Sequence, residues 1–352
     1  MMALQDSMNV YIDRNRRERV VIWGLAMLMV ALSVACVCVG SVNISLPEIW
    51  KALSGQLSPD DTVSLIVIQS RIPAALTALL AGGALGLAGL LLQTVFANPL
   101  AGPSVLGVST GASLGVAVVL LAFGGTLGSG IGMYFSTLGG AMLGAGAVML
   151  ALVGFSRFLH SSLMLLITGI MVGYIASSAI SILNFYATQE GVHSFVIWGL
   201  GSFTGVTLDR MAGFAVPVAV VTLWAMLLPK PLDALLLGED YASNLGVDVR
   251  RVRTCLLVIS GLLTALVTAY CGPIGFLGLV APHVARLLSG SSRHAVLLPA
   301  TFLSGAVMAL FCQFLSVLPS GGVMPVNAIT PLLGAPLIIY IIVNRRHIVY
   351  LQ

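Results

Sequence analysis

The sequence contains few charged residues: Asp, Glu, Lys and Arg make up 8% of its 352 residues, whereas 58% are hydrophobic. Soluble globular proteins carry roughly 25% charged residues, so the composition excludes an ordinary soluble domain. Each crossing of a bilayer requires about 20 apolar helical residues. The chain is therefore predicted to be one all-α membrane domain over residues 1–352, with room for about ten transmembrane helices.

Acidic residues are absent from the long apolar runs. All twelve carboxylates lie between those runs or at their edges. Ion-coupled carriers usually bind a proton or sodium ion through an acidic residue inside the membrane. An ion-coupled secondary transporter of a small organic solute is therefore the less favoured alternative, and the energy for transport is expected to come from another subunit.

Lysine is rarer still and occurs only as Lys51 and Lys230. Neither belongs to a G-x-x-x-x-G-K-[ST] motif, which binds nucleotide phosphates, so the chain is not expected to hydrolyse ATP itself. Basic residues do not cluster with aromatic residues on one face, as they do in many nucleic-acid-binding proteins. We expect no nucleic-acid partner and attribute the net charge of +4 to membrane topology.

Cysteine, histidine and carboxylate residues do not group with the spacing of a metal or catalytic site. The five cysteines form no C-x-x-C pattern, and His283, beside Pro282, has no second ligand nearby. His283 is therefore expected to pack or to form hydrogen bonds. A membrane-embedded enzyme is disfavoured, and no catalytic residue, metal or cofactor is predicted. The other histidines lie at segment edges: His160, His193, His294 and His347.

Apolar runs separated by charges, glycine and proline predict ten helices. They cover approximately residues 20–40, 64–96, 104–122, 131–155, 163–188, 211–228, 252–270, 274–288, 296–317 and 329–343. The first follows four arginines, as in a signal peptide, but no cleavage site ends it and it is expected to be retained. The second is long enough to tilt, or to break near Gly82, Gly83 and Gly86. The eighth is too short to span a membrane alone.

Basic residues are distributed unevenly between alternate loops. With the N-terminus cytoplasmic, thirteen of the sixteen fall on the inner side, and Lys51, Arg71 and Arg210 fall outside. Cytoplasmic loops of membrane proteins carry an excess of Lys and Arg. The chain is therefore predicted to lie in the lipid of the cell (inner) membrane with both termini cytoplasmic.

This topology would relate helices two to five and seven to ten by inversion, as in many transporters. Residues 102–107 loosely resemble residues 272–278, with one residue of slippage, which favours an inverted repeat. Glycines four residues apart are typical of closely packed membrane helices. Such pairs are Gly82 with Gly86, Gly111 with Gly115, Gly140 with Gly144 and Gly169 with Gly173.

The longest polar stretch between spans covers residues 231–253 and is cytoplasmic in this topology. Its leucines and Tyr241 recur on one apolar face at helical spacing, and Gly238 precedes Glu239 and Asp240 where one helix can end and another begin. Two short helices along the membrane surface are predicted. We expect them to dock an ATPase subunit; an interfacial loop with no partner is the alternative.

The fifth apolar run carries a polar stripe at positions i, i+4, i+7 and i+11, formed by Ser177, Ser181, Asn184 and Thr188. Such a stripe is typical of the wall of a water-filled pathway. Hydroxyl side chains in membrane helices also bond to the carbonyl four residues earlier, which is the alternative role for all but Asn184. Two loops rich in glycine and proline are expected to hold a fixed shape, at residues 98–103 inside and 319–325 outside.

Four stretches, in order along the chain, resemble a known family. They are RIPAALTALLAGGALGLAGLLLQTVFANPLAGPSVLGVSTGASLG (residues 71–115), LLLGEDYASNLGVDVRRVR (235–253), GPIGFLGLVAPHVARLL (272–288) and LLGAPLIIYII (332–342). Together they resemble the permeases of ABC importers for ferric siderophores, haem and cobalamin. The resemblance spans nearly the whole chain, but no single motif is specific for one of these three cargoes.

The resemblance implies a homodimer with the translocation pathway at its interface, two cytoplasmic ATP-binding-cassette subunits, and a substrate-binding protein that docks outside. The pathway walls then come mainly from helices five and ten, in agreement with the polar stripe. The implied ATPase-coupling residues are Leu235, Gly238, Glu239, Ala242, Leu245 and Gly246. The implied cytoplasmic gate residues are Asn98, Leu100, Ser161 and Ser162.

One departure concerns docking of the binding protein. Members of this family often enter helix two with an R-x-P-R pair whose arginines meet glutamates of the binding protein, whereas here Arg71 is followed by Ala74. Docking at the rim is therefore expected to depend on Arg71, or on other outer residues such as Arg210.

Overall fold

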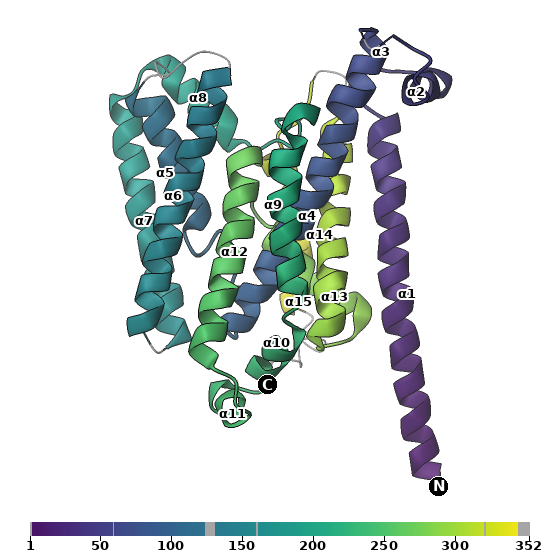
Figure 1. Cartoon of the computed structure of the whole chain (residues 1–352), viewed down its shortest axis with the longest axis vertical. Helices are drawn as coiled ribbons and strands as arrows, with labels where there is room; N and C mark the ends of the chain where they lie inside the picture. Colours follow the sequence, from purple (N-terminus) through teal and green to yellow (C-terminus); the bar gives the residue numbers. More distant parts are fainter. Residues whose placement is uncertain (1, 59, 124–130, 160, 320–321, 344–352) are drawn as a thin grey trace.

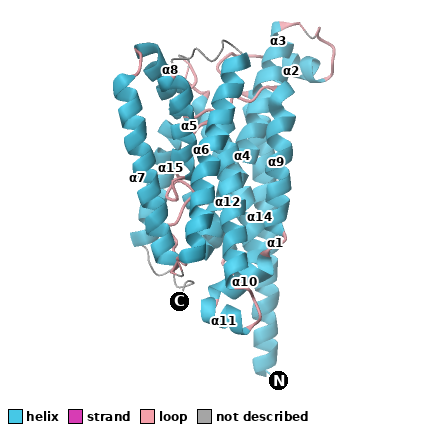
Figure 2. Ribbon diagram, turned by 60° about the vertical axis from the view of Figure 1, so that its left-hand side comes forward, coloured by secondary structure: helices cyan, strands magenta, loops and turns pink. Residues whose placement is uncertain are grey.

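The structure is a computed structural model that describes residues 2–58, 60–123, 131–159, 161–319 and 322–343. These residues form helices joined by loops (Figures 1 and 2). The first half of the chain contains α1 (Met2–Cys38), α2 (Leu46–Leu53), α3 (Thr62–Ser64), α4 (Ile72–Val95), α5 (Val108–Ala117), α6 (Ile131–Phe158) and α7 (Ser162–Tyr186). The second half contains α8 (Gln189–Gly199), α9 (Leu208–Met226), α10 (Pro229–Leu236), α11 (Glu239–Asn244), α12 (Val249–Cys271), α13 (Leu277–Ser289), α14 (His294–Ser316) and α15 (Val326–Val343).

The ten predicted apolar helices are all found in the described residues. Seven are long and apolar enough to cross a membrane, with Thr62–Val95 counted as one, and three are shorter: Val108–Ala122, Leu277–Ser289 and Val326–Ile341. Leu277–Ser289 is the eighth helix, which is short as predicted. The all-α, multi-pass membrane fold is thereby confirmed.

Helices α4 to α7 and α12 to α15 form the predicted inverted repeat. α4 packs on α13 and α14 just as α12 packs on α5 and α6, and α4 and α12 pack on each other. Likewise, α5 contacts α6 and α7, as α13 contacts α14 and α15. The matched helices run in opposite directions: α4 descends towards the end that carries α11, whereas α12 rises away from it (Figure 1). Equivalent positive-φ residues, Gly107 and Phe276, precede α5 and α13.

Glycines bring these helices into close contact. A Cβ atom on Gly111 or Gly115 of α5 would overlap the backbone of α6 at Gly144 or Gly140. Lipid provides no hydrophobic drive between helices, so close approach of small residues supplies the attraction. The predicted packing role of these glycine pairs is confirmed.

The second predicted helix tilts but does not break at its glycines. α4 is continuous through residues 82–86 and visibly inclined (Figure 1). Instead, the preceding residues Leu65–Arg71 adopt π-helical geometry. Pro73 lacks the N–H that would bond to the turn before it, which accounts for the irregular turn at this position. A break at Gly82, Gly83 or Gly86 is therefore wrong.

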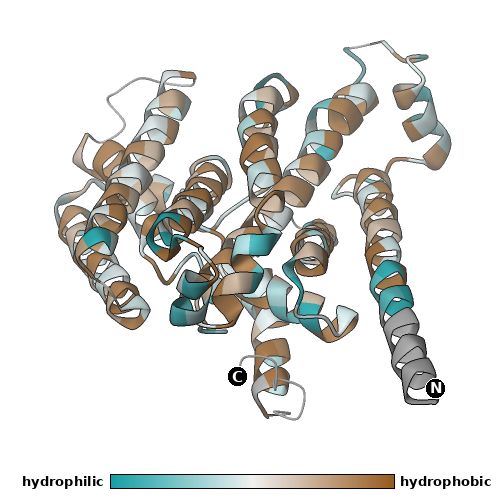
Figure 3. Cartoon of the chain, turned by 60° about the horizontal axis from the view of Figure 1, so that its bottom comes forward, coloured by the Kyte–Doolittle hydropathy of each residue, from teal (hydrophilic) through white to brown (hydrophobic). Residues whose placement is uncertain are grey.

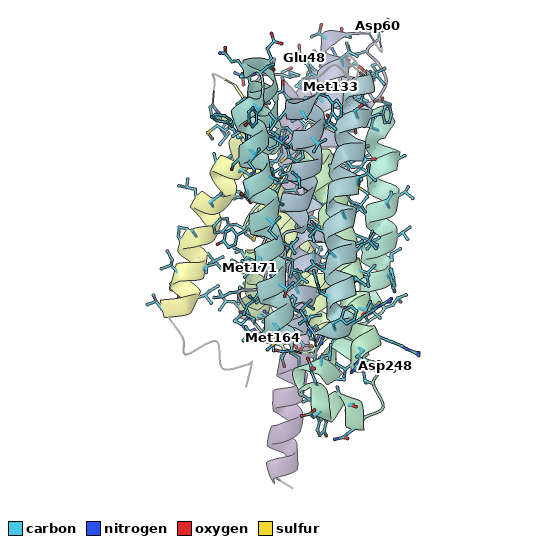
Figure 4. The ribbon with its side chains drawn as sticks, turned by 90° about the vertical axis from the view of Figure 1, so that its left-hand side faces the viewer. Glu48, Asp60, Met133, Met164, Met171 and Asp248 are labelled. Carbon is cyan, nitrogen blue, oxygen red and sulfur yellow. The ribbon has the colours of Figure 1, made fainter. Side chains whose placement is uncertain are left out.

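The bundle has two polar ends. One carries α2, α3 and α8 with Glu48 and Asp60, and the other carries α10 and α11 near Asp248 (Figures 1 and 4). We call them the α2 end and the α11 end. The start of α1 and the last turn of α15 both lie towards the α11 end, as an even number of spans requires (Figure 4).

Candidate coupling site at the α11 end

The short helices α10 and α11 lie where hydrophilic residues gather at one end of the bundle (Figure 3). α10 begins at Pro229, whose missing N–H is tolerated in the first turn of a helix. Gly238 (φ +101°) separates α10 from α11, and Gly246 (φ +82°) separates α11 from α12. Glycine adopts such φ values without steric cost. The two predicted short helices and the break between them at Gly238 are confirmed, and Gly246 forms a second bend.

The apolar residues of this segment divide between two faces rather than forming the single face predicted. Leu232 and Ala242 are fully buried against the bundle and thereby anchor α10 and α11 to the transmembrane helices. Leu237, Tyr241 and Leu245 are more than half exposed, at 62%, 54% and 59%. Exposed large apolar side chains at a polar surface are typical of a protein interaction site.

Glu239 opens α11 and connects it to two transmembrane helices. Its Oε1 accepts a hydrogen bond of 2.9 Å from the Ser162 hydroxyl at the start of α7. The same oxygen forms an ion pair with the buried guanidinium of Arg253 on α12. Beside this pair lies a cavity of about 440 Å³, whose charged lining residues are Arg157, Glu239, Asp240, Asp248, Arg250 and Arg253. The structure thus joins a predicted coupling residue to a predicted gate residue.

His294, the first residue of α14, forms a second connection that sequence reasoning missed. Its Nδ1 lies 2.8 Å from Asp233 Oδ1 on α10, and its Nε2 lies 3.0 Å from Thr94 Oγ1 near the end of α4. His294 is fully buried. Its position at the edge of an apolar segment therefore does not reveal that it joins two helices. Asp233 and His294 are 61 residues apart, and no spacing pattern links them.

The electrostatics of this connection favour an ionised Asp233. Burial raises the pKa of its carboxyl group. Hydrogen bonds from the His294 ring and from the His294 backbone N–H outweigh burial and hold the pKa below its usual value. A charged hydrogen bond therefore fixes α10 to the transmembrane bundle.

The loop between α4 and α5 carries the predicted gate residues Asn98 and Leu100. Asn98 Oδ1 accepts the Leu100 N–H at 2.9 Å, an Asx turn that fixes the loop shape. His283 of α13 lies 2.9 Å from the Pro99 carbonyl oxygen, so its predicted hydrogen-bonding role is confirmed. Ser161, the other predicted gate residue, caps α7 and accepts the Met164 N–H at 3.5 Å. The predicted gate residues therefore lie in the α4–α5 loop and at the start of α7.

The polar stripe of α7 is one residue shorter than predicted. α7 ends at Tyr186, because Ala187 adopts an extended conformation. Thr188 therefore does not continue the stripe but caps α8, where its Oγ1 accepts the Gly191 N–H at 3.2 Å.

The remaining residues of the stripe lie on one face of α7. Ser177 and Ser181 are exposed, and the Ser181 hydroxyl donates to the Ser177 carbonyl at 3.0 Å. Both serines are thus exposed, as the wall of a pathway requires. Ser181 also forms the bond to the carbonyl four residues earlier that is the alternative role of such hydroxyls. Asn184 Oδ1 is buried without a hydrogen-bond partner among the described residues.

A cavity of about 500 Å³ lies between α5, α7, α8 and α15. Its polar lining consists of hydroxyl and amide side chains, from Ser104, Ser109, Thr110, Ser113 and Asn327. Of the described residues that line it, none is charged. The cavity can therefore form hydrogen bonds but offers no ionic partner.

Asn327, which sequence reasoning missed, holds the loop that leads into α13. Its Nδ2 donates to the carbonyl oxygens of Gly199, at 3.0 Å, and Pro273, and its Oδ1 accepts the Gly275 N–H at 3.2 Å. The sequence signal for this role is the amide side chain of Asn327 just before the tenth apolar run.

Arg71 is not an exposed rim charge. Its side chain is buried, and its guanidinium donates to the carbonyl oxygens of Val37 and Cys38 at the end of α1 and to that of Val42 in the following loop. This charge satisfies carbonyls at the end of a helix rather than projecting from the rim, and docking through Arg71 stays a prediction. Arg210 is also engaged, since its guanidinium lies 3.7 Å from the centre of the Tyr134 ring.

These features define a multi-pass helical membrane protein with an uncharged cavity of mixed polar and apolar lining and two short helices at one end. The FecCD transport family matches residues 27–344. The chain therefore belongs to the FecCD transport family, and it is an ABC importer permease, not itself an enzyme.

Relatives and a solved structure agree with this assignment. The chain is 34% identical over 335 residues to the vitamin B12 import system permease protein BtuC of Klebsiella pneumoniae, covering 95% of this chain and 96% of that protein. It is 33% identical over 322 residues to the molybdate import system permease protein MolB of Haemophilus influenzae, covering 90% and 93%. A metal-chelate type ABC transporter in an inward-facing conformation matches with a TM-score of 0.81 and 30% identity, over 92% of this chain and 98% of that one.

Proposed function

We propose that this permease imports an amide-bearing metal chelate of the cobalamin class. The observation that carries the proposal is the cavity of about 500 Å³ beside α7, whose described lining offers hydroxyl and amide groups but no charge. Amide side chains of a cobalamin find matching donors and acceptors there. The carboxylates of haem, the charge of an anionic ferric siderophore or a molybdate dianion would be desolvated without a cationic partner.

We infer a homodimer whose pathway lies between the two copies. α7 and α15 border the same side of the bundle (Figures 2 and 4). Both expose large apolar side chains, including Ile175 and Phe185 of α7 and Leu332 and Ile339 of α15. A second copy packed on this side would cover these residues and enclose the cavity, with Ser177, Ser181 and Asn184 in the pathway wall.

The remaining partners follow from the two polar ends. Two ATP-binding-cassette subunits dock on the exposed face of α10 and α11, and a substrate-binding protein docks at the α2 end, with Arg71 supporting that surface from inside. The α11 end and both termini are cytoplasmic, because basic residues concentrate on that side of the cell (inner) membrane. Asn98, Leu100, Ser161 and Ser162 form the gate at this end.

The test is uptake into proteoliposomes that contain the permease, its ATP-binding subunits and its binding protein. Labelled cyanocobalamin, a ferric hydroxamate siderophore, haem and molybdate are compared with ATP inside the vesicles or with a proton gradient alone. We expect ATP-dependent uptake of cyanocobalamin. Binding of each compound to the binding protein is measured separately, so that a failure of transport is assigned to the permease.

A charge placed in the cavity tests the proposed cargo, and an uncharged variant at the same residue is the matched control. Thr110→Asp should reduce cyanocobalamin uptake, whereas Thr110→Val, which keeps the volume without the charge, should reduce it less. Uptake of haem or molybdate in preference to cyanocobalamin would contradict the proposed cargo. Uptake driven by the proton gradient alone would contradict an ATP-driven mechanism.

A further inference from the structure

A groove that the transport mechanism does not use lies at the α11 end, between α6 and α9. Both helices pack on α12, which forms its floor. The groove encloses about 450 Å³. Thr254, Cys255 and Val258 present one face of α12 to it, and Trp224 of α9 forms a wall. The groove is therefore apolar inside and faces outward from the bundle.

Three exposed arginines surround the mouth of this groove. They are Arg157 near the end of α6 and Arg250 and Arg251 in the first turn of α12. Arg251 forms an ion pair of 2.9 Å with Asp248. The guanidinium groups of Arg157 and Arg250 form no ion pair or hydrogen bond with the rest of the described chain.

These two arginines also border the neighbouring cavity that holds Glu239. Glu239 is engaged with Arg253 and Ser162 rather than with either of them. Two cations at the mouth of an apolar groove thus retain their capacity to bind an anion.

Apolar surface continues from the groove along α9. Val216, Val220 and Leu223 recur at helical spacing with exposures of 60%, 59% and 64%, and Trp224, 41% exposed, follows at the groove. Tryptophan is enriched at the depth of lipid headgroups. The surface therefore offers a track for an acyl chain, an aromatic residue at the interface, and cations beyond it.

We propose that this groove binds an anionic phospholipid, with its phosphate between Arg157 and Arg250 and an acyl chain along α9. Guanidinium groups bind phosphate oxygens in pairs of parallel hydrogen bonds. Basic pockets between transmembrane helices on the cytoplasmic side are known to take such headgroups. A bound lipid would hold the end of α6 to the start of α12, next to the Glu239 connection.

The test uses quenching of Trp224 fluorescence by brominated lipids. The full-length permease, assembled with its ATP-binding subunits, is placed in nanodiscs that contain a small fraction of dibrominated phosphatidylglycerol or of dibrominated phosphatidylcholine. The signal of Trp224 is the difference between the wild type and Trp224→Phe. We expect stronger quenching by phosphatidylglycerol, since each arginine near an anionic headgroup contributes a factor of about five to binding.

Variants assign this preference to the groove. Arg157→Gln with Arg250→Gln should weaken the preference by a factor of about 25. Arg16→Gln with Arg19→Gln removes two exposed charges from the same end of the bundle and should leave it unchanged. Equal quenching by both lipids in the wild type would overturn the proposal. So would a preference for phosphatidylglycerol that survives loss of Arg157 and Arg250.

Discussion

The Ser162 hydroxyl donates a hydrogen bond of 2.9 Å to the Glu239 carboxylate, so the first residue of α7 is held by the first residue of α11. The two residues are 77 positions apart. Glu239 also pairs with Arg253 of α12. A displacement of α11 by a partner would therefore act on the start of α7 and the start of α12 together.

Glu239→Gln should uncouple the ATPase from the binding protein. The variant keeps the size of the side chain but removes the charge that Arg253 and Ser162 contact, and hydrogen bonds to charged groups contribute about 1.5–3 kcal/mol. We expect stimulation of ATP hydrolysis by the loaded binding protein to fall about tenfold. Ser162→Ala, which removes one neutral donor, should have a smaller effect. Full stimulation in both variants would exclude a coupling role for this contact.

Gly246→Val should misplace α11. Gly246 has φ +82°, and no heavy atom lies near the position of a Cβ atom, so backbone conformation rather than space selects glycine. A side chain in the left-handed region costs about 1–2 kcal/mol. We expect Gly246→Val to insert in the membrane but to retain less of the ATP-binding subunits on co-purification. Gly246→Asn is the control, because asparagine tolerates positive φ; equal retention by both variants would contradict the prediction.

Asp233→Asn should reveal a pH-dependent contribution to stability. Burial raises the pKa of Asp233, but the His294 hydrogen bonds outweigh it, so the folded-state pKa lies below the unfolded value. The stabilisation is therefore present above the unfolded pKa of about 3.9 and is lost as the pH falls through the folded-state pKa. In thermal unfolding, the variant should be less stable by about 1.5–3 kcal/mol at pH 6. A deficit that is as large at pH 3 would be contrary to this explanation.

Much of the fold could be predicted because local sequence determines it. Bilayer thickness sets the length of apolar runs, so the ten helices could be predicted from where those runs begin and end. Gly238 and Gly246 could be recognised as bends, since few other residues suit that backbone and both follow short amphipathic stretches. The packing role of the glycine pairs in α5 and α6 could likewise be predicted, because small residues four apart allow membrane helices to approach each other closely.

Contacts between distant segments could not be predicted in the same way. The His294–Asp233 bond and the three bonds of Asn327 join residues that share no periodicity. Thr188 has the helical spacing of the stripe, but the sequence does not show that the extended backbone of Ala187 ends the helix before it. Arg71 looked like an exposed charge because the sequence does not show that the carbonyls at the end of α1 lie beside it.

Arg71→Ala should destabilise the permease rather than merely weaken docking. The buried guanidinium satisfies carbonyls of Val37, Cys38 and Val42, and removing it leaves those acceptors without their donor. Loss of charged, buried hydrogen bonds costs about 1.5–3 kcal/mol or more. We expect a lower unfolding temperature in detergent. Lys51→Ala, at an exposed residue of α2, is the control; unchanged stability of Arg71→Ala would contradict this structural role.

Cysteine labelling should show whether the α7 stripe faces the translocation pathway. A thiol reacts as its thiolate, which forms readily in water but not in lipid or in a packed core. In a variant without native cysteines, assembled with its ATP-binding subunits, Ser177→Cys and Ser181→Cys should therefore react with a charged, water-soluble reagent. Ala176→Cys lies next to Ser177 on the same helix but is buried, so it should stay unreactive. Labelling of the two serine positions no faster than of Ala176 would show that this face of α7 meets lipid or protein, and the pathway would then have to be sought elsewhere.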